Sequence, residues 1–368
     1  MTMPFDFHDL KTVSLANDEV TLRIPRRWEV VPHESDEGRW GCYEEEVDGV
    51  DPDTGTLWIS VDHYIWRGEG APPPGFDVKS HAEQAAARTR QAIAPLLADQ
   101  LTEVEDGLRW FRSYDVEEDG EPLRFWFSHF FLGRERHVAV ISFNLVLTHA
   151  QMDDPEFVEL REIIEREIAN AFLDPFKSDD WDAAEEALGP MHLCNFADWV
   201  KVSLPKAIGF SIDEEADEQR PRWYGRLETE YSHAAMFVDC QKMALRDEDG
   251  DPVNLPAEMY REVLDDVVGE PGGEDRYRRM PAGVVAVDTY EDTEGIGESD
   301  GNGGVFQGYR NRVWRYMVFE EGEAQLLTVL LILPLPEWDS GPYVALRCYL
   351  DGAVRRAEFP GFEPPERY

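Results

Sequence analysis

Lysine is scarce in this sequence. Only six of the 35 basic residues are lysine, and 76 acidic residues bring the formal net charge to −41. Residues 1–176 hold 36 acids and 16 bases (−20) and residues 177–368 hold 40 and 19 (−21), so both halves are acidic. Such a charge repels nucleic acid phosphates and anionic lipid surfaces, which are bound by basic patches. We therefore expect neither nucleic acid nor membrane as a partner.

The acidity itself has three open interpretations. It can be a well-solvated surface, and the shortage of lysine beside arginine then suggests a salt-rich habitat or a GC-rich genome. It can complement a basic protein partner, since opposite potentials steer association. It can also mimic DNA.

The charge predicts that stability depends on salt. Like charges repel one another at low ionic strength and are screened beyond about 10 Å at 0.1 M. We expect the melting temperature to rise between low and molar sodium chloride, as followed by scanning calorimetry. A melting temperature that does not change over this range would contradict the prediction.

Cysteine pairs and long apolar runs are also lacking. Cys42, Cys194, Cys240 and Cys348 are far apart, with no Cys-x-x-Cys spacing, so no zinc knuckle or redox pair is indicated and no cofactor is expected. The N-terminal residues show no basic segment followed by an apolar run, and the sequence has no stretch of 18 apolar residues. These features predict small buried cysteines, no membrane span and a cytoplasmic location.

The residues that are present predict a folded α+β protein. Hydrophobic residues make up 42% and aromatic residues 12%, which is too apolar for disorder, and 368 residues suffice for two domains. Alternation predicts strands at 19–31 and 57–66, and a helix is predicted over 78–98, which Pro95 should end or kink. Strands are then predicted at 108–116, 124–132 and 137–147. An amphipathic helix from Pro155 follows, and its apolar stripe is Phe157, Leu160, Ile163, Ile164, Ile168 and Phe172.

The second half repeats this order. WVKVSLPKAIGFSI at 199–212 resembles EVTLRIPRRWEVV at 19–31, with Pro205 where Pro25 stands. Further matches join Arg39–Trp40 to Arg222–Trp223 and Val61–Asp62 to Val238–Asp239. A helix at 256–268, strands at 282–290, 311–319 and 324–333, and a helix from near Pro342 complete the second copy. We predict two diverged copies, each a curved antiparallel sheet flanked by helices, at 12–176 and 195–355, with a linker at 177–194.

The first copy opens with alternating apolar residues, a proline, and a tryptophan three residues later. The residues in question are Leu22, Ile24, Pro25 and Trp28. In this the unit resembles the PsbP-like fold of photosystem II extrinsic subunits, the Ran-binding nuclear import factor, and bacterial DcrB-like proteins and type VI secretion adaptors. The resemblance implies a fold and no active site. Members with known roles mostly bind proteins, so it implies a non-catalytic interaction role.

The match is partial in both copies. The second copy keeps Val202, Leu204 and Pro205 but has Ile208 in place of the tryptophan. Closing helices of these families end near a Ser–Phe pair, whereas this chain has Ala171–Phe172.

Candidate chemical sites are weak. His63, His129 and His137 are predicted on strands and could approach one another near acids, but no catalytic motif frames them. The second copy is expected to place Cys240 and Met317 where His63 and His129 stand. The segments DEDGD at 247–251 and GESDGNGG at 297–304, and the cluster Asp288, Glu291 and Asp292, lack the spacing of calcium or phosphate sites. We interpret these features as structural.

The sequence thus favours a non-catalytic protein-interaction module, such as an adaptor, chaperone or immunity protein. Such a module would bind a polypeptide through a sheet face with an acidic rim. The alternative is an enzyme or small-ligand binder with an unrecognised site. As partner-binding residues we predict exposed aromatics on a short strand in each copy, beside acidic stretches at 44–48 and 228–230. They are Trp40, Tyr43, Trp223 and Tyr224.

Overall fold

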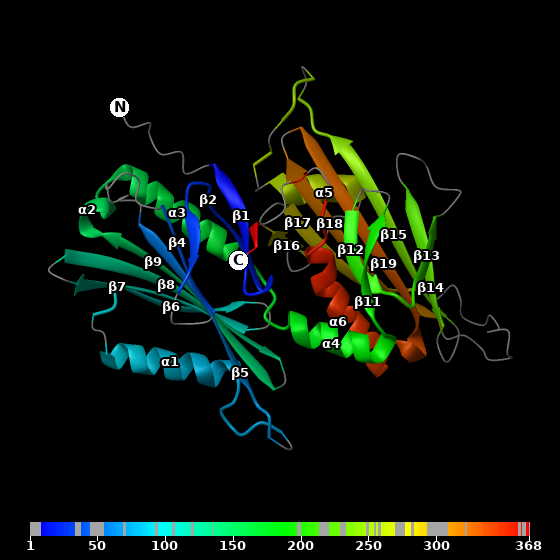
Figure 1. Cartoon of the computed structure of the whole chain (residues 1–368), viewed down its shortest axis with the longest axis horizontal. Coiled ribbons are helices and arrows are strands. Elements are labelled where there is room, and N and C mark those ends of the chain that lie inside the picture. Colours follow the sequence, from blue (N-terminus) through cyan, green and yellow to red (C-terminus); the bar gives the residue numbers. More distant parts are fainter. Residues whose placement is uncertain are drawn as a thin grey trace. The chain divides into compact units, whose positions relative to one another are not determined.

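The computed structural model covers the whole chain, which divides into two compact units. Unit 1 comprises residues 1–175 and 365–368, and unit 2 comprises residues 176–364 (Figure 1). The residues that the structure describes are 9–33, 38–44, 55–68, 71–92, 95–104, 107–118, 121–134, 136–196, 200–212, 221–228, 233–247, 250–253, 255–256, 259–268, 277–280, 283–292, 308–320, 322–359, 362 and 366–367.

Each unit contains one antiparallel sheet of seven strands, and helices accompany both, which confirms the α+β class. In unit 1 the order is β3 (Glu29–Pro32), β4 (Arg39–Tyr43), β5 (Thr56–Ile65), β9 (His137–Thr148), β8 (Glu121–Arg134), β7 (Gly107–Glu118) and β6 (Ala98–Val104). In unit 2 the order is β13 (Gly209–Ile212), β14 (Arg222–Glu228), β15 (His233–Ala244), β19 (Glu323–Pro334), β18 (Tyr309–Glu320), β17 (Gly283–Asp292) and β16 (Tyr277–Met280).

A smaller sheet accompanies each large one. In unit 1 its order is β10 (Phe172–Leu173), β2 (Val20–Pro25), β1 (Leu10–Leu15) and β20 (Glu366–Arg367). In unit 2, β11 (Met191–Phe196) pairs with β12 (Val200–Pro205), and Lys201 forms an isolated bridge with Glu358. Strand β2 ends at Pro25 and strand β12 ends at Pro205. The two prolines thus hold the same place in their strands, as the sequence predicted.

Helices cover both faces of the unit 1 sheet. The helices of unit 1 are α1 (Val78–Ala92), α2 (His149–Met152) and α3 (Pro155–Ala169), and those of unit 2 are α4 (Lys177–Leu188), α5 (Tyr260–Val268), the 3₁₀ turn η3 (Leu335–Glu337) and α6 (Gly341–Arg355). Figure 1 shows the sheet of unit 1 between α1 on one side and α3 on the other. The Asp154 side chain caps α3 by accepting a hydrogen bond from the Glu156 amide, with Pro155 in the first turn.

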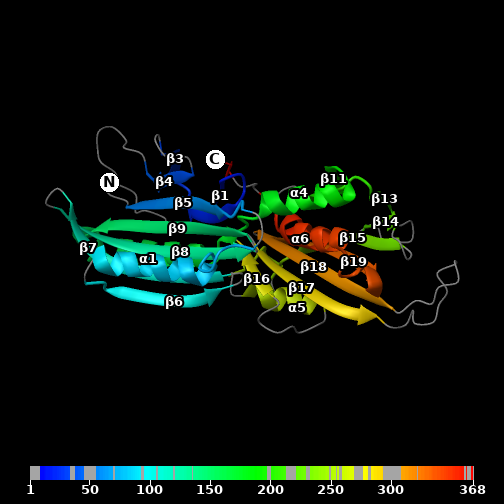
Figure 2. The same cartoon turned by 90° about the horizontal axis from the view of Figure 1, so that it is seen from below.

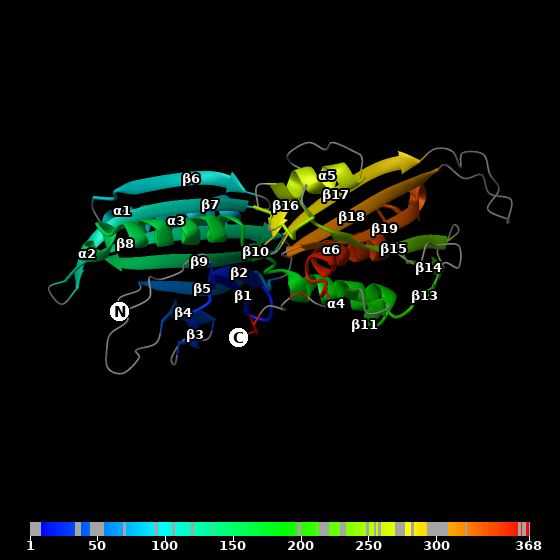
Figure 3. The ribbon, with the colours of Figure 1, turned by 90° about the horizontal axis from the view of Figure 1, so that it is seen from above.

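The positions of these elements correspond closely between the units. Residue numbers differ by 186 along the hairpins β8–β9 and β18–β19, whose closing pairs are Arg134 with His137 and Glu320 with Glu323. The same difference holds for α3 and α6, which both have 15 residues. Figures 2 and 3 let the reader follow the matching strand orders, β5-β9-β8-β7-β6 and β15-β19-β18-β17-β16. Residues at the same ladder position in the two units are counterparts.

The register corrects two of the sequence matches by two residues. Val61 pairs with Ile141, and the residue at that ladder position in unit 2 is Cys240, not Val238. His129 likewise has its counterpart in Arg315, not Met317. Side chains alternate with a period of two, so a slip of two residues keeps every side chain on its face. The hydrophobic pattern therefore could not detect it.

The boundaries of the second unit also differ from those predicted. Residues 177–194, predicted as a linker, form α4 and most of β11. Helix α4 packs on α6, where the Trp181 ring meets the edge of Tyr349 at 5.7 Å between centroids. The strand matching β1 thus begins at Met191 rather than at 195. Acidic, alanine-rich composition suggested a linker because the face of α4 that packs on α6 carries few large apolar residues.

One glycine in each unit permits close approach of two strands. A Cβ atom added to Gly107 on β7 would lie 1.9 Å from the carbonyl oxygen of Phe131 on β8. At the same ladder position in unit 2, a Cβ on Gly283 would lie 2.0 Å from the carbonyl oxygen of Met317. Glycine in a strand interior often marks such an approach. Neither position can take a side chain unless the backbone shifts.

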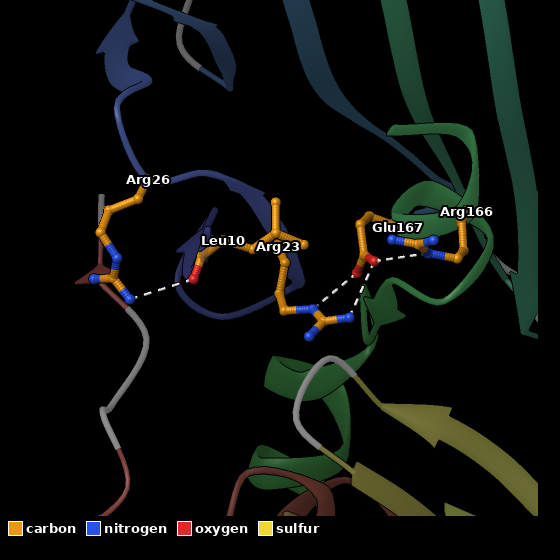
Figure 4. Close-up of polar contacts among 5 residues, drawn as sticks. All are labelled: Leu10, Arg23, Arg26, Arg166 and Glu167. Carbon is orange, nitrogen blue, oxygen red and sulfur yellow. Dashed lines mark hydrogen bonds and ion pairs between the residues drawn. The ribbon is translucent and has the colours of Figure 1, made fainter. Parts of the chain in front are cut away.

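A buried ion pair links β2 to α3 in unit 1. The Arg23 Nε and Nη2 atoms donate to Glu167 Oε2 and Oε1 at 2.9 and 3.0 Å (Figure 4). Only 1% of the Glu167 side chain is exposed, and Arg166 Nε approaches Oε1 at 3.3 Å. Unit 2 has Ser203 and Ala353 at these two positions, and there the Tyr349 hydroxyl donates to the Ser203 carbonyl at 3.0 Å.

The four cysteines form no disulfide with one another. Cys42, Cys194 and Cys240 are buried and Cys348 is half-buried, which agrees with the prediction of small buried residues for three of the four. Burial raises the pKa of Cys42 to about 12 and that of Cys194 to about 11, so both thiols stay protonated at neutral pH. Of the helices in the described part of the chain, none combines the length and apolar character needed to cross a membrane.

Candidate functional site

Alternate side chains of β7 and β8 form a continuous aromatic surface in unit 1. They project from the face of the sheet on which α1 lies, because adjacent strand residues point to opposite faces. We call this surface the aromatic face, and its members are Trp110, Arg112, Tyr114, Phe125, Phe127 and His129. The ladder pairs Trp110 with His129, Arg112 with Phe127, and Tyr114 with Phe125.

The rings of the aromatic face are stacked along the strands. Tyr114 lies 5.7 Å from Phe125 and 5.5 Å from Phe127 between ring centroids, with interplanar angles of 12° and 18°. The Phe127 and His129 rings are 5.5 Å apart at 9°, and His129 stacks on Trp110 at 5.5 Å. Offset stacking at such distances favours a fixed ring arrangement. The face is therefore pre-formed.

Arg112 lies at the centre of the aromatic face, where none of the described residues accepts a hydrogen bond from its Nε or Nη1. It is 8% exposed, and its guanidinium carbon lies 4.6 Å from the ring centroids of both Trp110 and Phe127. Its Nε and Nη1 atoms are buried and have no hydrogen-bond partner among the described residues. Burial lowers the pKa of Arg112, although the group remains a cation at neutral pH. Buried N–H groups of a cation are normally hydrogen-bonded, so this arrangement favours binding of an acceptor.

The nearest carboxylate on the neighbouring strand is engaged elsewhere. Asp99 on β6 pairs with Arg112 in the ladder, but its Oδ1 accepts from Trp110 Nε1 at 2.8 Å and its Oδ2 accepts from Arg90 Nε at 2.8 Å. Burial raises the pKa of Asp99, but these hydrogen bonds outweigh it and lower the pKa overall. Asp99 thus stays ionised and attracts Arg112 only through space.

Two further polar atoms beside Phe127 lack partners within the described part of the chain. They are His129 Nε2 and Asn144 Oδ1, both buried. Burial and the charge of Arg112 lower the pKa of His129 to about 3, so the ring is neutral, and its Nδ1 lies 2.8 Å from Ser142 Oγ. The ladder places Asn144 opposite Phe127 on β9. Donor and acceptor groups therefore converge on one area of the sheet.

Helix α1 covers only one end of this face. Ala82 and Ala86 of α1 pack on Trp110 and Phe131. Beyond the helix, Phe125, Phe127 and Asn144 are half-buried and Trp58 on β5 is 38% exposed. The uncovered end thus offers rings and unpaired polar atoms together.

The same positions in unit 2 are satisfied internally. Arg112 corresponds to Asp288 and His129 to Arg315, and Arg315 Nη1 donates to Asp288 Oδ2 at 2.6 Å. Helix α5 covers the equivalent end of the unit 2 sheet through Leu264, which packs with Ala286 and Met317. Unpaired charge on this face is thus a feature of unit 1 among the described residues.

The predicted exposed aromatic patch is absent. Trp40 and Trp223 are only 7% and 6% exposed. Both side chains project into the core from one face of their sheet. Trp40 is paired with the buried Ile59, and the Trp223 ring lies 5.0 Å from that of Phe196. The repeated Arg–Trp pair marks a shared core position, and the prediction of exposure was wrong. A strand second from the edge still buries one face.

The two predicted tyrosines are half-buried. The Tyr224 ring packs 4.9 Å from Phe237, and the Arg226 guanidinium carbon lies 5.2 Å from the Tyr224 ring centroid. Tyr43 lies at the end of β4. Of the acidic stretches, residues 45–48 and 229–230 lie outside the described residues. Partner binding by Tyr43 and Tyr224 therefore stays a prediction.

The histidines meet in a different pair from those considered. His63 Nδ1 lies 2.9 Å from His137 Nε2, and His63 Nε2 lies 2.9 Å from Glu19 Oε2, whereas His129 stays on the opposite face. The two nitrogens of one ring face different partners, so the three groups form a chain and do not converge on a point. Among the described residues no group of three or more His, Cys, Asp or Glu could hold a metal.

The acidic and glycine-rich segments offer no site in the described part. Residues 297–304 lie outside the described residues. Asp247 accepts at Oδ1 from the Asp251 amide at 2.9 Å, which is a local turn, and Asp288 is paired with Arg315. Glu291 and Asp292 belong to β17.

Sequence reasoning missed the aromatic face. The signal was present in RFWFSHFFL at 124–132, where Phe125, Phe127, His129 and Phe131 alternate with a second apolar series. The other series includes Trp126, Phe130 and Leu132, so large apolar side chains fall on both faces of the strand and periodicity does not single out one of them. Nothing in the sequence shows that α1 leaves part of one face uncovered.

Comparisons with known proteins find distant structural likenesses. No protein-family model matches the chain, and no curated protein matches it. Among solved structures, the Ran-binding protein Mog1p of Saccharomyces cerevisiae is similar at 11% identity and a TM-score of 0.31, over 46% of this chain and 97% of that one. A protein of Bacteroides thetaiotaomicron is similar at 12% identity and a TM-score of 0.26, over 49% and 61%. At these scores the likenesses carry no argument, and the α+β class rests on the elements described above.

Proposed function

We propose that this chain is a non-catalytic protein-interaction module whose aromatic face binds an extended polypeptide segment. The observation that carries the proposal is Arg112, a buried cation in contact with two rings, whose Nε and Nη1 have no hydrogen-bond partner among the described residues. A segment laid on Phe125 and Phe127 would bury apolar side chains and bring a carbonyl or carboxylate oxygen to Arg112. Charged hydrogen bonds of this kind contribute more than neutral ones.

Charge and shape favour a polypeptide over other ligands. The face spans neighbouring strands and presents rings, which suits extended peptides better than a compact ligand. Asp62 on β5 and Glu103 on β6 project from the same face and form part of an acidic rim. A net charge of −41 opposes nucleic acid phosphates. The preferred segment is therefore apolar at its centre, with one acceptor for Arg112 and basic residues flanking it.

We further propose that the two units are diverged copies of one PsbP-like unit. Shared strand order, the constant difference of 186 along two strands and a helix, and the paired Gly107 and Gly283 support common descent. In that case unit 2 keeps the framework, with Asp288 and Arg315 satisfied internally. Binding through this face would then belong to unit 1.

Replacing Arg112 by methionine tests the function. Peptides selected from a random phage-displayed library on the intact chain should bind the R112M variant about thirtyfold more weakly in fluorescence anisotropy, a loss of about 2 kcal/mol. Stability should be unchanged or higher, because a buried unpaired charge is removed.

The matched control is Arg315→Met in unit 2. It breaks a satisfied ion pair, so we expect lower stability and unchanged peptide affinity. The proposal fails if no peptide is enriched, or if selected peptides bind R112M as tightly as the original chain.

A further inference from the structure

A pocket lies on the other face of the unit 1 sheet. It has a volume of about 280 Å³ and lies where β8 and β9 meet α2 and α3. We call it the arginine pocket, and its main lining residues are Arg124, Trp126, His149, Met152, Phe157 and Arg161. Trp126 and Phe127 are adjacent on a strand and point to opposite faces. The arginine pocket is therefore separate from the aromatic face.

Two arginines flank one indole ring in this pocket. The guanidinium carbons of Arg124 and Arg161 lie 6.0 and 5.9 Å from the Trp126 ring centroid. Arg124 donates through Nε and Nη2 to Asp115 at 2.6 and 2.9 Å, and no described residue accepts from its Nη1. The pocket is thus rich in cationic donors in a chain dominated by acid.

Arg161 and His149 each have a buried nitrogen without a hydrogen-bond partner among the described residues. Arg161 Nε is buried without a hydrogen-bond partner among the described residues, and its contacts to Glu165 and Glu162 are long, at 3.7 and 3.9 Å. His149 Nε2 is likewise buried without such a partner, 3.5 Å from Asp115 Oδ1. Buried donors of this kind call for an acceptor.

In unit 2 an aromatic ring contacts the two arginines that correspond to Arg124 and Arg161. Adding 186 to Arg124, Met152 and Arg161 gives Arg310, Trp338 and Arg347. Both guanidinium groups lie over the Trp338 indole, with their carbons 5.2 and 4.0 Å from the ring centroid. Trp338 is buried. An aromatic ring thus occupies, in unit 2, the place where unit 1 has the shorter and unbranched Met152.

We infer that the arginine pocket binds a small planar aromatic anion. Its ring would contact Arg124 and Arg161, as Trp338 contacts Arg310 and Arg347, and would gain the same cation–π attraction. Its anionic group would accept hydrogen bonds from Arg161 and, where the imidazole presents an N–H, from His149. Leu147, Phe157 and Val158 add apolar contacts for the ring, and Asp153 contributes a carboxylate to the lining. Polar surface predominates in the lining, which favours a charged ligand over a purely apolar one.

Isothermal titration of the full chain with indole-3-acetate tests the inference. We expect saturable one-site binding, at least about tenfold tighter than for neutral indole or for hexanoate, since one lacks the charge and the other lacks the ring. No binding at millimolar concentration would overturn the inference. Equal affinity for neutral indole would overturn the role of the anionic group, and equal affinity for hexanoate would overturn the role of the ring.

Two variants locate the site. Met152→Trp should fill the pocket as Trp338 fills its counterpart and lower affinity at least about tenfold. Arg161→Met removes one of the two cations and should do the same, so the test stands if either variant folds. Exposed Arg88 on α1 is the matched control, and Arg88→Met should leave affinity unchanged. Unchanged binding in a folded M152W or R161M variant would overturn the assignment. The aromatic face plays no part in this test, so its result is independent of peptide binding.

Discussion

Replacing Glu167 by alanine should lower the free energy of unfolding by about 3–5 kcal/mol, because it leaves Arg23 partly buried without its partner. The pair is bidentate and the Glu167 carboxylate is almost completely buried, so little water can replace it. Chemical denaturation followed by circular dichroism measures the change.

Unit 2 supplies the control. It places Ser203 and Ala353 where unit 1 has Arg23 and Glu167, so the double variant Arg23→Ser/Glu167→Ala copies a solution that the chain already uses. We expect the double variant to be more stable than Glu167→Ala, because no buried charge is left alone. If the single variant loses less than about 1 kcal/mol, the ion pair does not contribute as the geometry indicates.

Gly107→Ala should destabilise unit 1 by about 2–3 kcal/mol, a large effect for one methyl group. The new Cβ would lie 1.9 Å from the Phe131 carbonyl oxygen, so two central strands must separate locally. Thermal and denaturant unfolding both measure the loss. Gly283→Ala should do the same in unit 2, where the corresponding distance is 2.0 Å.

The control for this prediction is Gly209→Ala. A Cβ at Gly209 meets no atom within 4 Å, so we expect a change within about 0.5 kcal/mol. Equal effects of the Gly107 and Gly209 substitutions would show that β7 and β8 are not held as closely as described.

Much of the framework could be predicted from the sequence because it depends on local periodicity. The strands at 137–147 and 324–333 and the helix from Pro155 appear as predicted, within a few residues. β6 (Ala98–Val104) was missed, because its exposed and mixed residues show no alternation. Helix α1 ends at Ala92, before Pro95, which was predicted to end or kink it, because a proline disfavours helix in the residue before it.

The sites could not be predicted in the same way, because they depend on what is missing from their surroundings. Arg112 reads as an ordinary polar residue in a strand until the structure shows that Asp99 is occupied by Trp110 and Arg90. The prominence of Trp40 and Trp223 came from repetition, which marks shared core positions as readily as shared function. The interpretation of the arginine pocket depends on comparing the two units, because Trp338 of unit 2 stands where unit 1 has Met152.

The pairing of strand β20 with β1 determines how the chain responds to a pulling force. It pairs in parallel with β1 through Val13 with Glu366 and Ser14 with Arg367, and Arg367 donates to Asp18 at 3.0 Å. The polypeptide thus leaves unit 1 after residue 175 and rejoins it at residue 365. Tension applied between residues 9 and 367 would load this two-pair ladder in shear. The 189 residues of unit 2 would bear no load until it parted.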